Sequence, residues 1–236
     1  MRDSLISFGT LNIDVVFNAP GDDLAKRFGN LACLGATMGY KLKNNFYLEG
    51  GARLVFGSRV KEPVATNVMT LYGNVNQGYS GTATGADGRQ STVRMQARGM
   101  QIPIYFGKIL PFSKKMNPNS GLYFNVGTQV FQHRIWLEVP ANNVPALDKD
   151  KRKGYDRLCN GMGVMEGFGI RYHSSKRLFN VHLGIEISQN FTANRRTVNV
   201  DTGLHDSGTR LDLLWGIRAA WVVPIYKTSP EKAYYN

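Results

Sequence analysis

One stretch of the sequence decides the fold: LFNVHLGIEISQ, residues 178–189. Apolar side chains occupy alternate positions along it, at Phe179, Val181, Leu183, Ile185 and Ile187. The positions between them are mostly polar and include His182 and Glu186. A tilted strand of about ten residues crosses a bilayer core, whereas soluble strands usually have about five or six. The alternation predicts a membrane-spanning strand with one face toward lipid and the other toward a barrel lumen.

The rest of the chain supplies enough partner strands to close such a barrel. The eight expected strands cover residues 5–17, 31–42, 46–57, 93–106, 121–138, 162–172, 178–189 and 210–226. Short connections follow the second, fourth and sixth strands, and longer polar connections follow the others. Outer-membrane barrels have this layout, with short periplasmic turns and long external loops. We therefore predict an all-β fold with one domain over residues 1–236, an eight-stranded antiparallel transmembrane β-barrel with long external loops.

The longest of these connections, residues 59–94, is rich in Gly, Thr and Ser and lacks an alternating pattern. It is predicted to be an external loop without strands, which is common on membrane barrels and uncommon in compact soluble domains.

Composition limits the function classes. The 236 residues have a mean hydropathy of -0.27 and no apolar run long enough for a transmembrane helix. Barrel strands alternate, so a low average still allows a membrane protein. The net charge of +12 suits nucleic acid, anionic lipid or an acidic protein surface as a partner. No zinc spacing, basic helix or RNA-binding aromatic pair is present, so nucleic acid is not expected.

The sequence offers little for cofactor chemistry. Cys33 and Cys159 lack metal-ligand spacing and either form one disulfide or remain two half-buried thiols in strand ends. No glycine-rich phosphate cradle is present, and no cofactor or metal is expected. Residues 1–5 carry no recognisable signal peptide, although a bacterial outer-membrane protein is expected to be exported with one.

Inward positions of the expected strands carry charges of both signs. The predicted lumen polar network consists of Glu49, Arg53, His133, His182, Glu186, Asp212 and Arg218, and Arg210 faces the same way. Side chains fill the interior of an eight-stranded barrel, and buried charges must pair, so a packed polar plug is expected. A narrow ion path and a His/Glu catalytic pair are the alternatives. The histidines and acids point inward and no serine lies at a suitable spacing, so no catalytic residue is assigned.

Aromatic and basic residues mark the two surroundings of the barrel. The predicted aromatic girdle contains Trp136, Phe179, Phe191, Trp215 and Trp221. Phe179 and Phe191 bracket an apolar row about 30 Å tall after tilt, close to the about 25 Å of an outer-membrane belt. The predicted external basic loops contain Lys149, Lys151, Arg152, Lys153, Arg157, Arg195 and Arg196. They are expected to bind lipopolysaccharide phosphates or an acidic partner, or to be merely solvated.

A soluble lipocalin-like barrel is the alternative fold. Its faces are reversed, with apolar residues inside and polar residues outside. The length of the strands, the inward charges and the alternating loop lengths favour the membrane reading.

Several runs give the chain a family resemblance. They are NPNSG at 117–121, KGYDRL at 153–158, RLDLLWGIRAAWVVPIY at 210–226 and the tail EKAYYN. The chain resembles small outer-membrane barrels of Bacteroidota, some of which accompany large outer-membrane machines such as type IX secretion and barrel assembly. It departs from the proteobacterial pattern, in which the last strand ends in Phe. The expected filled lumen, the absence of a catalytic constellation and the large basic loops predict a non-enzymatic accessory or scaffold subunit of such a complex in the bacterial outer membrane, in contact with lipids including lipopolysaccharide and with other envelope proteins. A lipid-modifying enzyme and a small-solute pore are the alternatives.

Overall fold

The computed structural model describes residues 5–112, 117–140, 143–174 and 180–225. Its elements in chain order are β1 (Phe8–Gly21), α1 (Asp22–Arg27), β2 (Leu31–Lys41), β3 (Phe46–Gly57), β4 (Thr70–Asn74), β5 (Gly78–Thr84), β6 (Gln90–Pro111), β7 (Gly121–Glu138), the 3-10 helices η2 (Pro145–Leu147) and η3 (Lys151–Gly154), β8 (Cys159–His173), β9 (Asn180–Asn194) and β10 (Thr209–Ile225).

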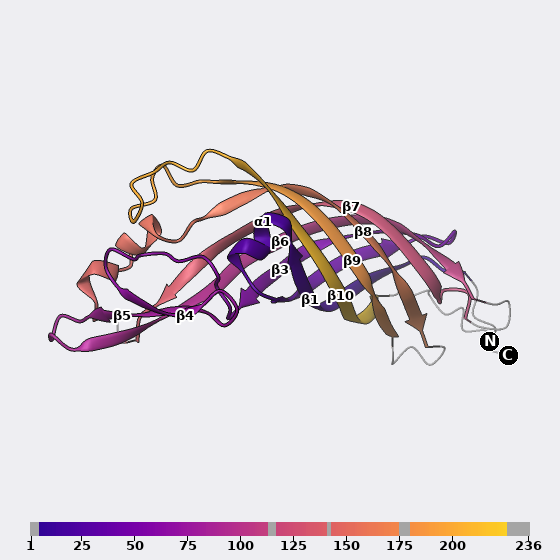
Figure 1. Cartoon of the computed structure of the whole chain (residues 1–236). Helices are drawn as coiled ribbons and strands as arrows, with labels where there is room; N and C mark the ends of the chain where they lie inside the picture. The colour runs from indigo at the N-terminus through magenta and orange to yellow at the C-terminus, as the bar shows by residue number, and fades with distance from the viewer. Residues whose placement is uncertain (1–4, 113–116, 141–142, 175–179, 226–236) are drawn as a thin grey trace, which may run out of the picture.

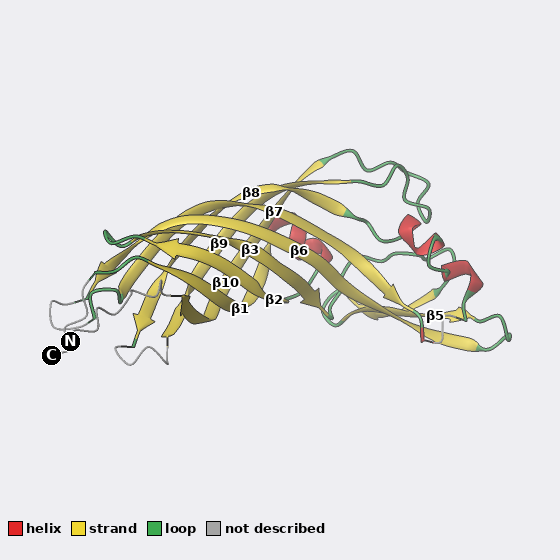
Figure 2. Ribbon diagram, turned by 180° about the vertical axis from the view of Figure 1, so that it is seen from behind, coloured by secondary structure: helices red, strands yellow, loops and turns green. Residues whose placement is uncertain are grey.

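Eight of these strands form a closed antiparallel barrel (Figures 1 and 2). They pair in the order β3-β2-β1-β10-β9-β8-β7-β6, and β3 pairs with β6 to complete the ring. The predicted eight-stranded antiparallel barrel is confirmed. β1 runs further than expected, to Gly21, because Pro20 lies beyond the pairing with β2, where its missing N–H is not needed.

The prediction of a strand-free loop over residues 59–94 is wrong. β4 and β5 form a hairpin there, and β5 pairs with the start of β6. β6 has 22 residues and continues well beyond the pairing with β3. Both hairpin strands are short and interrupted by glycine, so their sequence carries too little alternation to mark them as strands.

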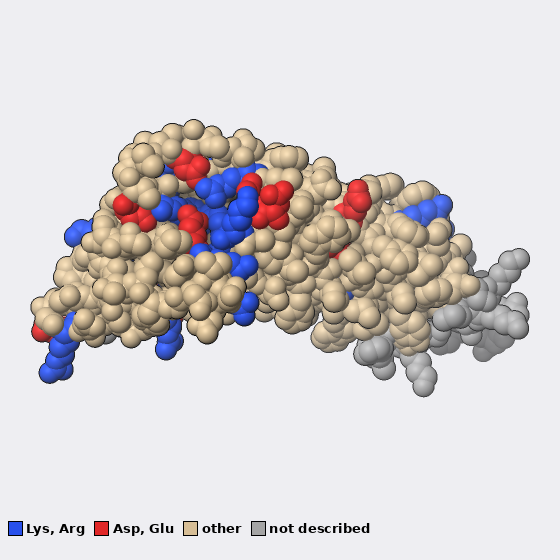
Figure 3. Space-filling view, viewed as in Figure 1, with Lys and Arg blue, Asp and Glu red and all other residues tan. Residues whose placement is uncertain are grey.

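The two ends of the barrel differ. The start of β1, the end of β10 and the connections β2–β3 and β6–β7 lie at one end, called here the turn end. The other end, the loop end, carries α1, the β4–β5 hairpin, η2, η3 and the connection between β9 and β10 (Figure 1). On the face shown in Figure 3, charged side chains gather mainly at the loop end.

The outward residues of the barrel form a mostly apolar belt. The apolar belt consists of the outward alternate residues within 9–19 of β1, 32–40 of β2, 46–56 of β3, 100–110 of β6, 122–130 of β7, 162–172 of β8, 181–191 of β9 and 211–225 of β10. Many large side chains in it are more than half exposed, including Met38, Ile217 and Trp221. Soluble monomers do not present such a continuous apolar surface to water, so this surface is suited to lipid.

Toward the loop end the same strands reverse their chemistry. On β6, Val93 and Met95 are buried inside, whereas Arg94 faces outward. On β7, Ile135 is buried inside and Arg134 faces outward. These inward side chains belong to the loop-end core, which is completed by α1 and the loops; its members include Val16, Leu24, Phe28, Val60, Val64, Val93, Met95, Phe131, Ile135, Leu147, Tyr155 and Leu214. The loop end is therefore packed like a water-soluble domain on top of a membrane barrel.

Two smaller features complete the fold. Cys33 and Cys159 are buried free thiols on β2 and β8, so the disulfide alternative is not realised. Among the described residues, the helices are too short or too polar to cross a membrane.

Candidate functional site

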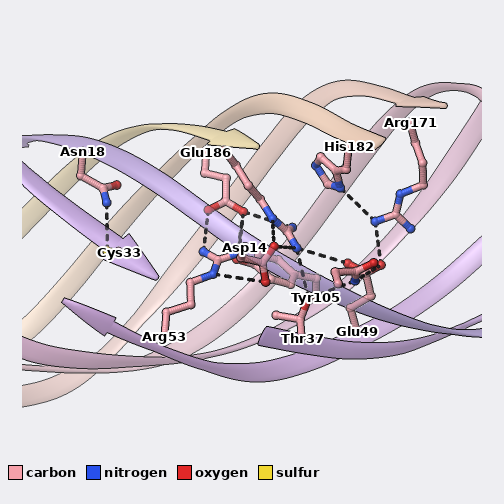
Figure 4. A network of polar contacts seen from close by, with 12 residues as sticks. Asp14, Asn18, Cys33, Thr37, Glu49, Arg53, Tyr105, Arg171, His182 and Glu186 are labelled. Atoms are coloured by element: carbon pink, nitrogen blue, oxygen red, sulfur yellow. Dashed lines mark hydrogen bonds and ion pairs between the residues drawn. The ribbon is translucent and has the colours of Figure 1, made fainter. Parts of the chain in front are cut away.

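Three arginines and three acids meet inside the barrel at the level of the apolar belt. The central network consists of Arg53 on β3, Arg171 on β8, Arg218 on β10, Asp14 on β1, Glu49 on β3 and Glu186 on β9. Each of these side chains is buried. Figure 4 shows how the labelled members converge from different strands. The formal charges balance, three positive against three negative, which is the condition for holding ions in a closed interior.

Arg218 occupies the centre of this network. Its Nε donates to Asp14 Oδ1 at 2.8 Å, and its Nη2 lies 2.6 Å from the same oxygen. Its Nη1 donates to Glu186 Oε1 at 3.3 Å, and its Nη2 also lies 3.8 Å from Glu49 Oε2. One guanidinium therefore connects all three carboxylates, because its planar fork has donors in several directions.

Arg53 and Arg171 hold the same carboxylates from other sides, and Arg53 Nε also lies 3.8 Å from Asp14 Oδ2. Arg53 donates to both oxygens of Glu186, with Nη1 2.8 Å from Oε2 and Nη2 3.3 Å from Oε1. Arg171 donates through Nη2 to Glu49 Oε1 at 2.6 Å and to His182 Nδ1 at 3.0 Å. His182 therefore accepts from a guanidinium and is part of the packed network.

Tyrosine rings close the network against the rest of the lumen. The Arg171 guanidinium lies 4.4 Å from the ring centre of Tyr47. Arg53 and Arg218 lie 5.6 and 5.2 Å from the ring centre of Tyr105, whose hydroxyl donates to Glu186 Oε1 at 2.9 Å. Cation–π contacts of this kind are stronger where water is excluded. The lumen at this level is therefore filled by side chains.

A second, smaller polar cluster lies nearer the loop end. His133 Nε2 is 2.8 Å from Asp212 Oδ2, which also accepts from Thr192 Oγ1 at 2.5 Å. The rings of Phe28 and Phe131 pack against His133, with centroids 5.6 and 5.0 Å away. His133 and Asp212 thus lie inside the barrel but outside the central network.

The structure places all seven predicted lumen residues inside the barrel, in these two clusters. The predicted set lacked Asp14, Arg171 and Tyr105. All three lie at inward alternate positions of their strands, so the alternation contained the signal that could have found them.

The site shows no arrangement suited to covalent catalysis. Cys159 is the register partner of His133, but its thiol accepts from Arg27 Nη1 at 3.1 Å. Ser188 is buried and accepts from Asn190. Within the part of the chain that the structure describes, no group of three His, Cys, Asp or Glu side chains could hold a metal ion. The Cys159 thiol and the Ser188 hydroxyl thus accept hydrogen bonds from Arg27 and Asn190, and neither of these described contacts is to a base.

Three predicted members of the external basic loops, Arg157, Arg196 and Lys153, are engaged in ion pairs. Arg157 is buried, and its Nε and Nη2 donate to Glu62 and Asp201. Arg27 donates to the same Glu62 at 2.6 Å. Burial alone would raise the pKa of Glu62, but the guanidiniums of Arg27 and Arg157 hold that pKa below its usual value. Arg157 therefore fixes loops together and is not an exposed basic residue.

Arg196 is also paired, through Nε and Nη2, with both oxygens of Asp156. Arg152 is half-buried and donates to the carbonyl of Leu147 at 2.5 Å. The exposed members of the predicted set are Lys149, Lys151, Lys153 and Arg195. Lys153 pairs with Asp150, so the basic surface is smaller than the sequence indicated.

The four described members of the predicted aromatic girdle lie at different depths of the barrel wall. Trp215 and Trp221 lie within the outward row of β10, with Ile217 between them and further apolar residues on either side. Trp136 lies beyond the belt, beside Arg134 in the polar outward part of β7, with the guanidinium 5.0 Å from its ring centre. Phe191 is exposed at the end of the belt on β9, and Phe179 lies outside the described residues.

No protein-family model matches this sequence, and no curated protein matches it. Three solved structures similar to the chain are Neisserial surface protein A, Ail, the attachment invasion locus protein of Yersinia pestis, and the outer membrane protein OprG from Pseudomonas aeruginosa. The first two are each 8% identical, cover 91% of this chain and 96% and 97% of their own, and have TM-scores of 0.39 and 0.40. OprG is 9% identical, covers 96% of this chain and 100% of its own, and has a TM-score of 0.39. Because these identities and TM-scores are low, the fold is assigned from the strand pairing of the chain itself.

Proposed function

We propose that this chain is a non-enzymatic barrel of the bacterial outer membrane that serves as an accessory or scaffold subunit of a larger envelope complex. The complex would act in protein secretion or outer-membrane protein assembly. The apolar belt and the contrast between short turns and long loops support the membrane location. The belt would contact outer-membrane lipids directly.

The filled interior is the observation that carries the proposal. The central network occupies the lumen at mid-depth, and the loop-end core closes it above. A solute path would need an open lumen, and an enzyme would need a reachable nucleophile or base. The outer surface is then the part of the molecule through which it acts.

The loop end supports a scaffold role because its loops are held in place. Glu62 and Asp201 come from connections far apart in the sequence, and Arg157 links both of them. Such ion pairs and the loop-end core below them give a preorganised surface, which lowers the ordering cost of binding a partner. The exposed Lys149, Lys151 and Lys153 would contact lipopolysaccharide phosphates or an acidic protein surface.

Purification from native membranes tests the proposal. The tagged chain should show heat-modifiable migration on a gel, which separates a closed membrane barrel from an unfolded chain, and should retain stoichiometric partner proteins identified by mass spectrometry. The control is an unrelated small barrel carrying the same tag. Recovery of a lone monomer under conditions that preserve other envelope complexes would contradict the scaffold role.

Two further measurements address the alternatives. In planar bilayers the purified chain is expected to show no steady conductance, whereas reproducible channels would support a small-solute pore. Cells carrying His133→Ala and His182→Ala are expected to keep their lipid A composition. A change in lipid A that disappears in these variants would support a lipid-modifying enzyme.

A further inference from the structure

One carboxylate faces lipid in the middle of the apolar belt. Glu166 belongs to the outward row of β8, between Val164 and Phe168, and is exposed. The belt on β8 extends from residue 162 to residue 172, which is about 25 Å along the membrane normal at the usual tilt. Glu166 lies about 10 Å from the loop-end edge of that span, well below the headgroups. Among the described residues, no hydrogen bond or ion pair within the chain involves Glu166.

A hollow in the outer wall surrounds this carboxylate. Glu166 pairs in register with Val126 on β7 and Ile187 on β9, and these residues line a hollow of about 420 Å³. Phe124 and Phe168 form one side of it, with ring centroids 4.9 Å apart. A concave site with one aromatic side and one carboxylate is suited to a long side chain ending in a cation.

The face that carries Glu166 is also more polar than the opposite face. Thr128 on β7 and Gln189 on β9 are exposed outward residues, and both pair in register with Val164. The outward rows of β1 and β2, on the other side of the ring, contain only apolar residues, Gly and Tyr40. An unpaired ionisable group in hydrocarbon is costly, so such groups are normally paired and mark a functional contact.

We propose that this hollow is a docking site for a transmembrane segment of another envelope protein, which inserts a lysine or arginine side chain against Glu166. The proposal deepens the scaffold function proposed above and rests on it. A second copy of this chain would bring an identical carboxylate and an identical hollow, so like charges would meet and neither hollow would be filled. The cationic headgroups of lipids lie at the membrane surface, about 10 Å too far from Glu166.

The first test is site-specific photo-crosslinking in native membranes. A photo-crosslinking amino acid replaces Ile187, which lines the hollow, and in a matched chain it replaces Met38, an outward residue of β2 on the opposite side of the ring. The Ile187 position is expected to crosslink to a membrane-embedded peptide of a protein that co-purifies with the chain, next to a Lys or Arg. The Met38 position should give at least about tenfold less of that product.

The second test reverses the charge. Glu166→Lys is expected to lower the amount of the crosslinked partner in the purified complex by about tenfold or more, and Glu166→Gln less so. Met38→Lys places the same charge in the belt away from the hollow and controls for insertion cost. The folded fraction of each variant is measured by heat-modifiable migration, and yields are compared per folded barrel. Replacing the partner's basic residue by Glu should restore its recovery with Glu166→Lys.

The outcomes separate the two proposals. If partners co-purify equally with wild type, Glu166→Lys and Met38→Lys, and no protein crosslinks at Ile187, the docking site is wrong while the scaffold function stands. A crosslink from Ile187 to the chain itself would replace the docking site by self-association. If the wild type retains no partner at all, the scaffold function and the docking site both fail.

Discussion

The membrane-spanning part of the barrel and its loop end use the same strands with opposite chemistry. On β6, Tyr105 and Gln101 face a polar interior while Ile104 faces outward in the apolar belt. Further along the same strand, Val93 enters the loop-end core while Arg94 faces outward. The alternation never shifts register; only the side on which apolar residues stand changes. The medium outside the wall decides which face is apolar, and the reversal marks where lipid gives way to water.

The difference also predicts two kinds of vulnerability. The central network is held by charge pairing in a closed space, so loss of one ion leaves others without compensation. The loop-end core is held by apolar burial, so loss of one side chain costs its transfer free energy and a cavity. Substitutions in the central network and in the loop-end core should therefore destabilise different parts of the molecule.

The largest effect is expected in the central network. Arg218→Leu leaves Asp14 without its closest cation and removes a partner from Glu186, and we expect it to lower the free energy of unfolding by about 3–5 kcal/mol. Urea unfolding in lipid vesicles, followed by heat-modifiable migration, measures the loss. Arg89→Leu, in the exposed hairpin turn, is the matched control and should change it by about 0.5 kcal/mol or less. Equal stability of the two variants would mean that the network is dispensable.

A loss confined to the loop end is expected from Leu147→Ala. Leu147 is fully buried in the loop-end core, and its truncation should cost about 2–5 kcal/mol of local stability. Protease cleavage of the loops in intact vesicles should rise, whereas heat-modifiable migration of the barrel should persist. Leu204→Ala removes an exposed leucine and serves as control. If Leu147→Ala also abolished heat-modifiable migration, the two regions would not be separate units.

Much of the barrel could be predicted from the sequence, because the alternation of apolar and polar residues shows which side chains face the lumen and which face outward. The stretch at 178–189 correctly predicted β9, and the inward positions of Arg53 and Glu186 followed from parity. The alternation assigns a side chain to the inner or outer face of the barrel, but it does not identify the side chain with which it pairs. Arg171 and Asp14 join the network only because five strands bring them to one level of the lumen, which a single strand does not encode.

The wrong predictions concern residues whose surroundings cannot be read from the type of side chain or from its neighbours in the sequence. Arg157 lies in a dense basic run and was predicted to be exposed, but Glu62 and Asp201 reach it from other loops. Trp136 is predicted in the aromatic girdle because it is aromatic, although the reversal of faces on β7 comes before it. The outward charge of Glu166 was visible in the sequence, and it becomes notable only once the belt around it is known.

The boundary between the belt and the loop end can be located by comparing two arginine substitutions, one on each side of it. Ile217→Arg puts a charge in the belt of β10 and is expected to cost about 2–4 kcal/mol of barrel stability. Thr92→Arg puts the same charge on the outward face of β6 at the loop end and should cost about 0.5 kcal/mol or less. Urea midpoints in vesicles compare them. A similar cost at both positions would place the loop end in lipid and contradict the reversal.

The smallest predicted effect concerns pH and the loop end alone. The pKa of Glu62 is lower in the folded chain because Arg27 and Arg157 stabilise the carboxylate. A carboxyl with a lowered folded pKa contributes stability above its unfolded pKa, about 4.3, and that contribution is lost as the pH falls through the folded value. Protease cleavage of the loops in vesicles should therefore increase below about pH 4.3.

Glu62→Gln tests which group is responsible. It should raise cleavage at pH 7 by an amount corresponding to about 1 kcal/mol and flatten the dependence on acid pH. Asp87→Asn, in the exposed β5–β6 turn, should leave the wild-type pH profile unchanged. Because Glu62 lies outside the belt, heat-modifiable migration should not depend on pH in this range in either variant. A parallel loss of the barrel at the same pH would mean that the charges of the central network, rather than the loop contacts, set the acid limit.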